Sequence, residues 1–344
     1  MIKIKPLIQK LLQNLDERKR SVLVGRFGLD GKEAETLQAI GDKYGITRER
    51  VRQIESLALS DIRGLIKGNK DVEAILASVN KEISALGGVA KEETLLERVQ
   101  KVLGKEATLQ GISFLREASK SFGHQVETDE FYPFWHNDEK AVKAANQLIG
   151  KVEAVLKEKK EEVLEKGKFG EVFAKLAKSQ GVAEEIGLNF LSVSKKFSVS
   201  PYGDFGLSEW TEVNPATIRD WSYLVLKKEK QPLHFGEIAK KISLIHSKKK
   251  KVFTPTVHNE LIKDQRFVLV GRGIYGLAEF GYEAGGIKDL IKKILKSKAG
   301  LKTEEIVKLV NEQRMFKKNT IILHLQDRKI FKKDVNGKFF SNEA

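Results

Sequence analysis

The chain of 344 residues lacks cysteine altogether and contains only six histidines. Without cysteine there can be no disulfide, no thiolate nucleophile and no zinc site built on sulfur. The histidines show neither HxH nor HxxxH spacing, and neither a P-loop nor a GxSxG sequence is present. Because metal sites and common catalytic centres need such patterns, we expect a protein without metal, without cofactor and without enzymatic activity.

Long apolar runs are also missing. No run approaches the roughly 20 residues that cross a bilayer, and residues 1–6 lack the apolar core of a signal peptide. We therefore expect a soluble, cytoplasmic protein.

Acidic residues are in the minority, with 47 Asp and Glu against 62 Lys and Arg, which gives a net charge of +15. Residues 1–66 carry +4, residues 67–212 carry −3, and residues 213–280 and 281–344 carry +7 each. Such an excess favours a polyanionic partner, nucleic acid before an anionic membrane, although a solvated basic surface has the same composition. Polyanion binding is thus expected at the two ends, with the middle as a spacer or a protein-contact surface.

Four short segments alternate apolar and polar residues around a turn, which indicates β-hairpins. They are residues 197–207, 267–277 and 329–340, with 124–135 as a weaker case. Glu171, Glu237 and Glu305 each open a short amphipathic helix, at separations of 66 and 68 residues. Helices first and a hairpin last, at a period near 70, match the size of a winged-helix unit, although chance similarity among amphipathic helices would also give a period.

We therefore predict a mainly α-helical protein, with an N-terminal helix-turn-helix domain followed by tandem winged-helix-like units with small β-hairpin wings. The predicted units are residues 1–68, 69–138, 139–212, 213–282 and 283–344. The third unit begins with a charged stretch at 139–166 that lacks proline, which predicts a long connector helix.

Residues 15–63 carry the most specific local pattern. Asp16 can cap a helix that the Gly-Leu-Asp-Gly sequence at 28–31 breaks. Two further caps follow, Thr36 and Thr47, with the turn glycine Gly45 between them. The expected inward residues are Leu37, Ile40 and Tyr44 in the second helix and Val51, Ile54 and Ala58 in the third. Two short helices around a tight turn predict a helix-turn-helix.

The third of these helices has a long polar face. At 100° per residue the polar side chains fall within an arc of about 140°, opposite the apolar stripe. They are Arg48, Glu49, Arg52, Gln53 and Ser56. Guanidinium, amide and carboxylate groups match base edges in a major groove, although an ordinary solvated helix face has the same spacing.

The sequences RFGLDG and TLQAIGDKYGITRERVRQIESLAL resemble region 4 of the housekeeping class of bacterial sigma factors, over about 50 residues. The resemblance implies a bacterial, nucleoid-associated protein that binds double-stranded promoter DNA together with RNA polymerase core. It implies that four residues face base edges, namely Arg48, Glu49, Arg52 and Gln53. It implies that five residues hold phosphates, namely Arg18, Arg26, Thr36, Thr47 and Arg50.

The sequence departs from the sigma pattern in two places. Ser60 and Asp61 precede Arg63 where the family usually carries more basic residues. Nothing in the sequence resembles the aromatic-rich region 2 of a complete sigma factor. The three tryptophans, Trp135, Trp210 and Trp221, are isolated and expected in cores. We therefore do not expect this chain to open a promoter alone.

Residues 213–280 resemble a HARE-HTH domain, the winged-helix module also found in the delta subunit of RNA polymerase. The resemblance rests on WSYL from Trp221, PLHFGEIA from Pro232, TPTVHNELIK from Thr254, and the hairpin at 267–277. Further basic candidates in this unit are Lys248, Lys249, Lys250, Lys251 and Arg272. They are interpreted either as phosphate-binding groups or as solvated loop residues.

Together these patterns predict a sequence-specific DNA-binding transcription factor that resembles a sigma factor and acts in transcription initiation by reading a promoter element with the helix at 47–63. Two alternatives stay open. One is an RNA polymerase-associated adaptor that does not read bases, and the other is the DNA-recognition subunit of a restriction or modification system.

Overall fold

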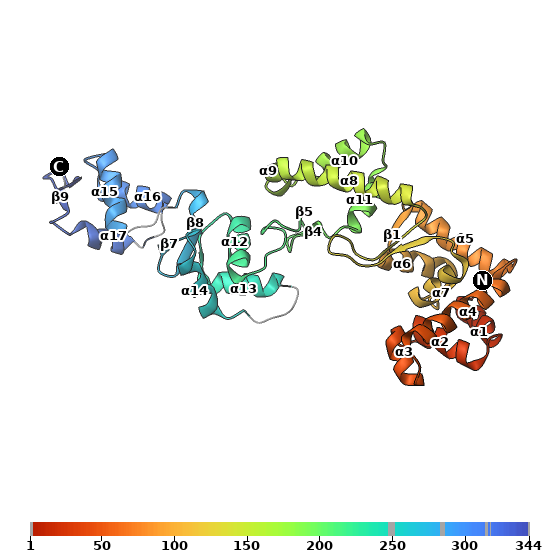
Figure 1. Ribbon diagram of the computed structural model, residues 1–344. Helices are drawn as coiled ribbons and strands as arrows, with labels where there is room; N and C mark the ends of the chain where they lie inside the picture. Colours follow the sequence, from red (N-terminus) through yellow and green to blue (C-terminus); the bar gives the residue numbers. More distant parts are fainter. Residues whose placement is uncertain (1–2, 247–251, 283–285, 314–315, 317, 343–344) are drawn as a thin grey trace. The chain divides into compact units, whose positions relative to one another are not determined.

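The computed structural model describes residues 3–246, 252–282, 286–313, 316 and 318–342. The chain forms two compact units, Met1–Phe197 and Ser198–Ala344, which we describe separately. The described residues form seventeen α-helices and several small antiparallel sheets, which confirms the mainly α-helical class (Figure 1). Among the described residues, no helix is both long and apolar enough to span a membrane.

The first four helices form the helix-turn-helix region. They are α1 (Ile4–Gln13), α2 (Glu17–Phe27), α3 (Leu37–Tyr44) and α4 (Arg48–Ile66). The caps are those that the sequence predicts: the side chains of Asp16, Thr36 and Thr47 accept hydrogen bonds from the first turns of α2, α3 and α4. Gly28 and Gly45 end α2 and α3 in the left-handed conformation, which glycine adopts without strain.

The next segment has winged-helix topology. Its elements are α5 (Lys70–Ala85), β1 (Val89–Lys91), α6 (Glu92–Leu103), α7 (Leu109–Ser119), β2 (Gly123–Gln125) and β3 (Phe134–His136). The strand before α6 pairs with the last strand, giving the sheet order β1-β3-β2. In this unit the wing is the β2–β3 hairpin, and α7 is the third helix.

The third segment differs from its prediction. Its elements are α8 (Glu139–Glu158), α9 (Lys160–Leu164), α10 (Phe169–Ser179), α11 (Glu184–Ser192) and the two-stranded sheet of β4 (Phe197–Val199) and β5 (Phe205–Leu207). The single long helix is wrong, because Lys159 leaves helical geometry and separates α8 from α9. Nor is α8 only a connector, since Leu148, Ile149 and Val152 are buried along one face of it.

The fourth segment repeats the winged-helix order. It contains α12 (Ile218–Glu229), β6 (Leu233–His234), α13 (Phe235–Ile245), α14 (Thr254–Lys263), β7 (Phe267–Gly271), β8 (Ile274–Leu277) and the 3₁₀ turn η1 (Ala278–Phe280). The sheet order is β6-β8-β7, and the core is made by the three helices and the sheet together. Its third helix is α14.

The last segment has the same order with a reduced sheet. It contains α15 (Ile287–Ser297), α16 (Thr303–Gln313), α17 (Lys318–Leu325), β9 (Phe331–Lys333) and β10 (Phe339–Ser341). Leu301, just before α16, makes a single β-bridge to Phe339 and so takes the place that β6 holds in the preceding segment. A separate core of side chains from α15, α16, α17 and the hairpin holds this unit together.

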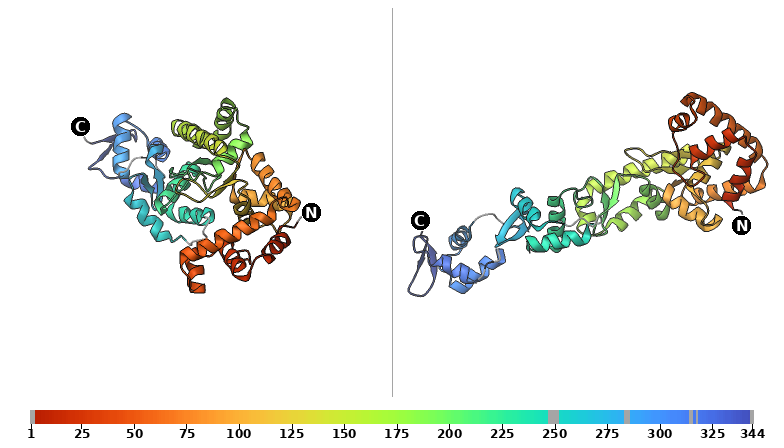
Figure 2. Two further views of the ribbon diagram at one scale, coloured as in Figure 1. Left: turned by 45° about the vertical axis from the view of Figure 1, so that its right-hand side comes forward. Right: turned by 90° about the horizontal axis from the view of Figure 1, so that it is seen from below.

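In the first compact unit, one large core joins the helix-turn-helix region to the first winged-helix-like unit. It runs from α1 through the second half of α4 to α7 and Trp135. The two views in Figure 2 show α1–α7, in red to yellow-orange, gathered in one mass. The helix-turn-helix is thus built onto the unit that follows it.

The predicted core residues are mostly correct. Val51, Ile54 and Ala58 are buried, as are all three tryptophans. Tyr44 is an error, since 40% of it is exposed. The reason is that α3 approaches the backbone of the following segment at Gly41, so Tyr44, nearly one turn later, lies beyond this contact.

Candidate nucleic-acid interface

The α3–α4 turn is held by a close backbone contact. The N–H group of Ile46 donates to the carbonyl of Gly41 at 2.9 Å. A Cβ atom at position 41 would lie 2.6 Å from the carbonyl oxygen of Ile46, so only glycine allows this approach. A small core beneath the turn, made by Val22, Ile40, Val51 and Ile54, fixes the first half of α4 on α2 and α3.

The polar face of α4 lies in solvent. Arg48, Glu49, Arg52, Gln53 and Ser56 are all exposed, while the opposite stripe is buried. Arg52 forms a two-pronged ion pair with Glu49, at 2.7 and 2.9 Å, and this lowers the pKa of Glu49 below its usual value. The contact is an exposed one and so a weak constraint, which leaves these groups able to turn toward another partner.

The five predicted phosphate ligands have different surroundings. Arg18 and Arg50 are exposed, and the Arg50 guanidinium donates to the side-chain amide oxygen of Gln53 at 3.0 Å. The hydroxyls of Thr36 and Thr47 already accept hydrogen bonds from Ala39 and Arg50 backbone N–H groups. A phosphate at either helix start would therefore meet the remaining free N–H groups of the first turn.

Arg26 differs from the other predicted phosphate ligands because it is half-buried. Its Nη1 atom donates to the backbone carbonyl of Glu35 at 3.2 Å, and its Nε atom lies 3.3 Å from Oε1 of Glu55 on α4. Burial raises the pKa of Glu55, and the charge of Arg26 offsets part of that rise. Arg26 thus ties α2 to α4 and to the loop before α3.

The second half of α4 packs against α7. Arg63 donates from Nε to the backbone carbonyl of Ala118 at 2.9 Å, and Asp61 pairs with Lys19 of α2 at 2.9 Å. Phe27 and Phe114 add an edge-to-face ring contact with centroids 5.6 Å apart. This packing explains the departure at the end of the sigma-like sequence: Asp61 and Arg63 serve contacts within the chain.

The remaining basic candidates belong to the second compact unit. Arg272 is exposed at the turn of the β7–β8 hairpin. Lys248, Lys249, Lys250 and Lys251 lie outside the described residues. Across the part of the chain that the structure describes, no three His, Asp or Glu side chains gather as a metal site would need.

Two features of this region were not predicted from the sequence. Position 55 was not singled out, because it looks like one more polar residue of α4 and its contact with Arg26 bridges 29 positions. The packing of α7 on α4 was also missed, since amphipathic periodicity shows which face is buried but not against what. The apolar spacing of Ile112, Phe114 and Leu115 was the available signal.

The short helix α3 is joined at Gly45 to the longer helix α4, whose inner face is packed and whose polar face is exposed. This arrangement defines a helix-turn-helix protein. Comparison with known families agrees: the model for sigma-70, region 4, matches residues 11–64. Two relatives illustrate the likeness. The RNA polymerase sigma factor RpoS of Coxiella burnetii (strain RSA 493 / Nine Mile phase I) is 48% identical over 60 residues, and the RNA polymerase sigma factor SigA of a Bacillus species is 45% identical over 60 residues.

Both matches are confined to a small part of each protein. They cover 17% of this chain, 17% of the Coxiella protein and 16% of the Bacillus protein. The chain therefore spans about a sixth of the length of these curated relatives. The likeness concerns the helix-turn-helix region alone.

Proposed function

We propose that this protein is a sequence-specific DNA-binding transcription factor that works with RNA polymerase at promoters, reading one promoter element through α4. The observation that carries the proposal is the exposed face of α4. Its Arg48, Glu49, Arg52 and Gln53 stand in a segment that matches sigma-70 region 4, and α4 is held rigidly beneath them. Arginine pairs with guanine, glutamine with adenine, and glutamate accepts from the amino group of cytosine.

In this proposal the predicted phosphate ligands have different roles. In this proposal Arg18 and Arg50, with the N–H groups behind Thr36 and Thr47, contact phosphates and set the register of α4 in the groove. Arg26 acts as a positioning residue, since its guanidinium is already engaged by Glu35 and Glu55.

We further propose that residues 213–282 form a winged-helix module of the HARE-HTH kind. The order α12, β6, α13, α14 and the β7–β8 hairpin supports this assignment, together with the sequence resemblance. Because that kind of module also occurs in a polymerase subunit, it is consistent with a polymerase partner, but this support is analogy.

The test is a binding comparison on the full chain. Duplexes bound by the protein would be selected from a random pool with and without RNA polymerase core, and the preferred duplex compared with a random one. Arg52→Ala and Gln53→Ala are each expected to cost about 1 to 3 kcal/mol on the preferred duplex and little on the random duplex. Lys81→Ala, on the exposed face of α5, removes one charge as a control and should leave the preference unchanged.

Equal weakening on both duplexes would exclude base reading by α4. A pull-down of RNA polymerase after nuclease treatment addresses the adaptor alternative. The adaptor hypothesis would be favoured over the transcription-factor hypothesis by two results together. RNA polymerase would be retained without DNA, and the α4 variants would bind every duplex as the parent does.

A further inference from the structure

The C-terminal winged-helix-like unit, residues 287–341, carries a cationic groove that the sequence reasoning did not single out. The groove opens between the end of α17 and the β9–β10 hairpin and has a volume of about 750 Å³. Its walls include the side chains of Arg328, Lys332 and Lys333. Lys329 and Lys338, from the same hairpin segment, are exposed beside them.

These five cations form no ion pair with a carboxylate among the described residues, and only the charge of Lys329 acts on a carboxylate, that of Asp327. Arg328, Lys329, Lys332, Lys333 and Lys338 form no ion pair there, and Lys333 lies over the ring of Phe339 at 5.4 Å. The two nearby carboxylates are used elsewhere. Asp327 pairs with Lys288 of α15 at 2.7 Å, which lowers the pKa of Asp327, and Asp334 accepts the backbone N–H groups of the hairpin turn.

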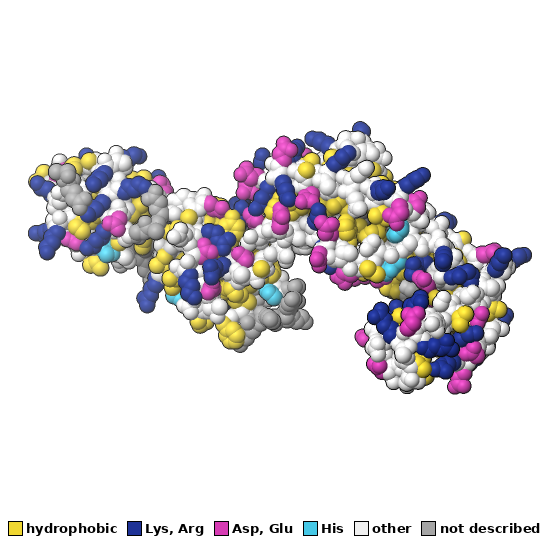
Figure 3. All heavy atoms as spheres, in the orientation of Figure 1, with side chains coloured by type: hydrophobic (Ala, Val, Ile, Leu, Met, Phe, Trp, Pro, Cys, Tyr) yellow, Lys and Arg dark blue, Asp and Glu magenta, His cyan; other side chains and the backbone are white. Residues whose placement is uncertain are grey.

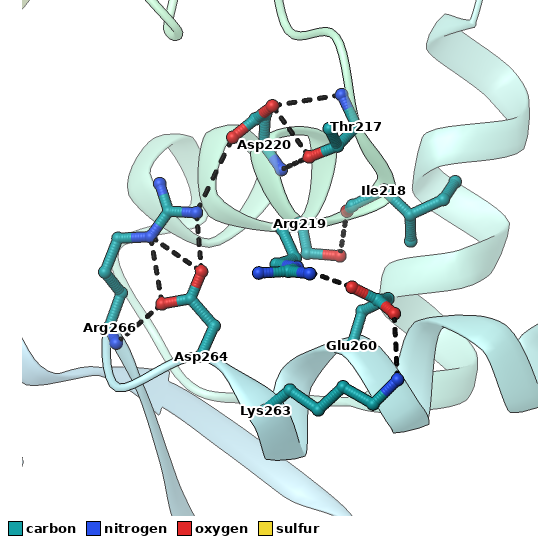
Figure 4. Close-up of polar contacts among 9 residues, drawn as sticks. Thr217, Ile218, Arg219, Asp220, Glu260, Lys263, Asp264 and Arg266 are labelled. Atoms are coloured by element: carbon teal, nitrogen blue, oxygen red, sulfur yellow. Dashed lines mark hydrogen bonds and ion pairs between the residues drawn. The ribbon is translucent and has the colours of Figure 1, made fainter.

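The preceding winged-helix-like unit provides the contrast, since two of its three arginines are paired internally. Arg266 forms a two-pronged contact with Asp264 and lies 3.5 Å from Asp220, and Arg219 pairs with Glu260 (Figure 4). Such pairs join the start of α12 to the end of α14. These two guanidinium groups are therefore held by carboxylates of their own unit, unlike Arg328 in the groove.

We propose that this groove is a second DNA-binding site, which holds the phosphate backbone of a duplex through Arg328, Lys332 and Lys333. A duplex presents one negative charge per about 1.7 Å of axis, a continuous row that matches cations set along one strand and its flanking loop. The site is independent of base reading by α4 and adds affinity without sequence preference.

The surroundings of the groove favour a duplex over an anionic membrane. Asn319 of α17 and Gln326 just after it are exposed, and their side-chain amides are of the type that donates to phosphate oxygens. A membrane-binding surface would need a broad apolar face. In the described part of this unit, the large apolar side chains with high exposure are Leu323 and Val335, on separate elements. Figure 3 shows dark-blue side chains outnumbering magenta ones over this unit.

The experiment measures how the affinity of the full chain for a random duplex depends on salt. The variant Arg328→Gln/Lys332→Gln/Lys333→Gln removes three charges from the groove. Lys140→Gln/Lys143→Gln/Lys175→Gln removes the same number from exposed positions of α8 and α10. Each lost phosphate contact lowers the slope of log K against log salt by about 0.9. Between 50 and 200 mM salt, the factor by which affinity falls should therefore be about 40 times smaller in the groove variant than in the parent. The control variant should show the same fall as the parent.

An unchanged slope in the groove variant, with its fold intact by circular dichroism, would overturn the proposal. So would a loss of binding to phosphatidylserine vesicles without any loss of duplex binding, because the groove would then belong to a membrane site. The outcome is separable from the proposed function, since Arg52→Ala changes preference on the selected duplex while the groove variant changes the salt dependence on any duplex.

A second measurement uses the absence of cysteine. Val335→Cys, at the fully exposed hairpin turn, can be labelled with one fluorophore without competition from other thiols. Binding of a duplex carrying a quencher should dim this label strongly, and a label at Lys143→Cys on α8 should dim much less. Equal dimming at both positions would contradict the placement of DNA at the groove.

Discussion

In residues 70–136 the third helix, α7, buries Phe114, Leu115 and Ala118 against its neighbours, α4 among them, whereas in residues 287–341 the third helix, α17, leaves Leu323 66% exposed. The two units share one order of helices and strands, down to the pairing of the segment before the second helix with the last strand. The third helices nevertheless differ: α17 buries Ile321 and Leu325 on its inner face but leaves its outer face uncovered.

The wings of the two units also differ in how far their own chain covers them. The β2–β3 loop carries Glu127, Asp129 and Glu130, and it is tied back to the chain: the N–H of Tyr132 donates to the Val193 carbonyl, and the N–H of Lys195 donates to the Glu130 carbonyl. Ion pairs from Lys195 and Lys196 reinforce this contact. The β9–β10 hairpin instead carries cations that have no carboxylate partner among the described residues.

The same topology thus allows two different roles. A winged-helix-like unit whose third helix and wing are covered by its own chain cannot present either element to a DNA groove. Residues 70–136 therefore act as a support for α4, which we call the mount. In the C-terminal unit the wing and the outer face of the third helix are exposed, and both can contact a partner. What covers each unit, rather than its fold, decides between these roles.

The largest effect on stability is expected from weakening the core between α4 and α7. Phe114→Ala removes a fully buried ring from the core shared by α4 and α7 and should cost about 3 to 5 kcal/mol of unfolding free energy. Leu323→Ala, at the equivalent helix of the C-terminal unit, should change stability by less than about 0.5 kcal/mol. Urea denaturation of both full-length variants measures this difference. Similar losses in the two would show that α7 and α17 have similar surroundings after all.

The ends of the first helices could be predicted because local chemistry sets them. Asp16, Thr36 and Thr47 cap helices through hydrogen bonds to N–H groups two or three residues away, and Gly45 needs a left-handed turn. The hairpins were likewise predictable from alternation and turn residues. Local rules failed at Tyr44, where the contact of α3 with the following backbone decides, and at Lys159, where the structure shows no cause for the break in the helix.

The candidate site divides in the same way. That Arg52 and Gln53 are exposed follows from helical periodicity, since Val51 and Ile54 must face inward. The engagement of Arg26 could not be predicted, because its partner lies on another helix. The free cations of the C-terminal hairpin could not be told from the paired ones of the preceding unit, since both segments have the same net charge in sequence.

A smaller effect should appear in the pH dependence of the mount. Burial raises the pKa of Glu55, so the folded protein holds this proton more tightly than the unfolded chain. The resulting stability is present below pH 4.5 and is lost as the pH rises through the raised pKa. Glu55→Gln should lack this loss in urea denaturation series from about pH 2 to 8. Glu49→Gln is the matched control with the opposite sign, because Arg52 lowers the pKa of Glu49 and its contribution is lost as the pH falls.

A pH dependence of the same sign in both variants would show that Glu55 is not distinguished by its burial. Its contact with Arg26 would then resemble an ordinary surface pair.

The smallest effect is expected at the acidic wing. Glu127→Gln/Asp129→Asn/Glu130→Gln removes three negative charges, which would raise duplex affinity and steepen its salt dependence if this wing lay near phosphates. Because the loop is held against residues 193–195, we expect the slope of log K against log salt to change by less than about 0.5. The full chain and a random duplex suffice for this measurement. A marked gain in affinity would place the first wing beside DNA and would remove the distinction between the two units.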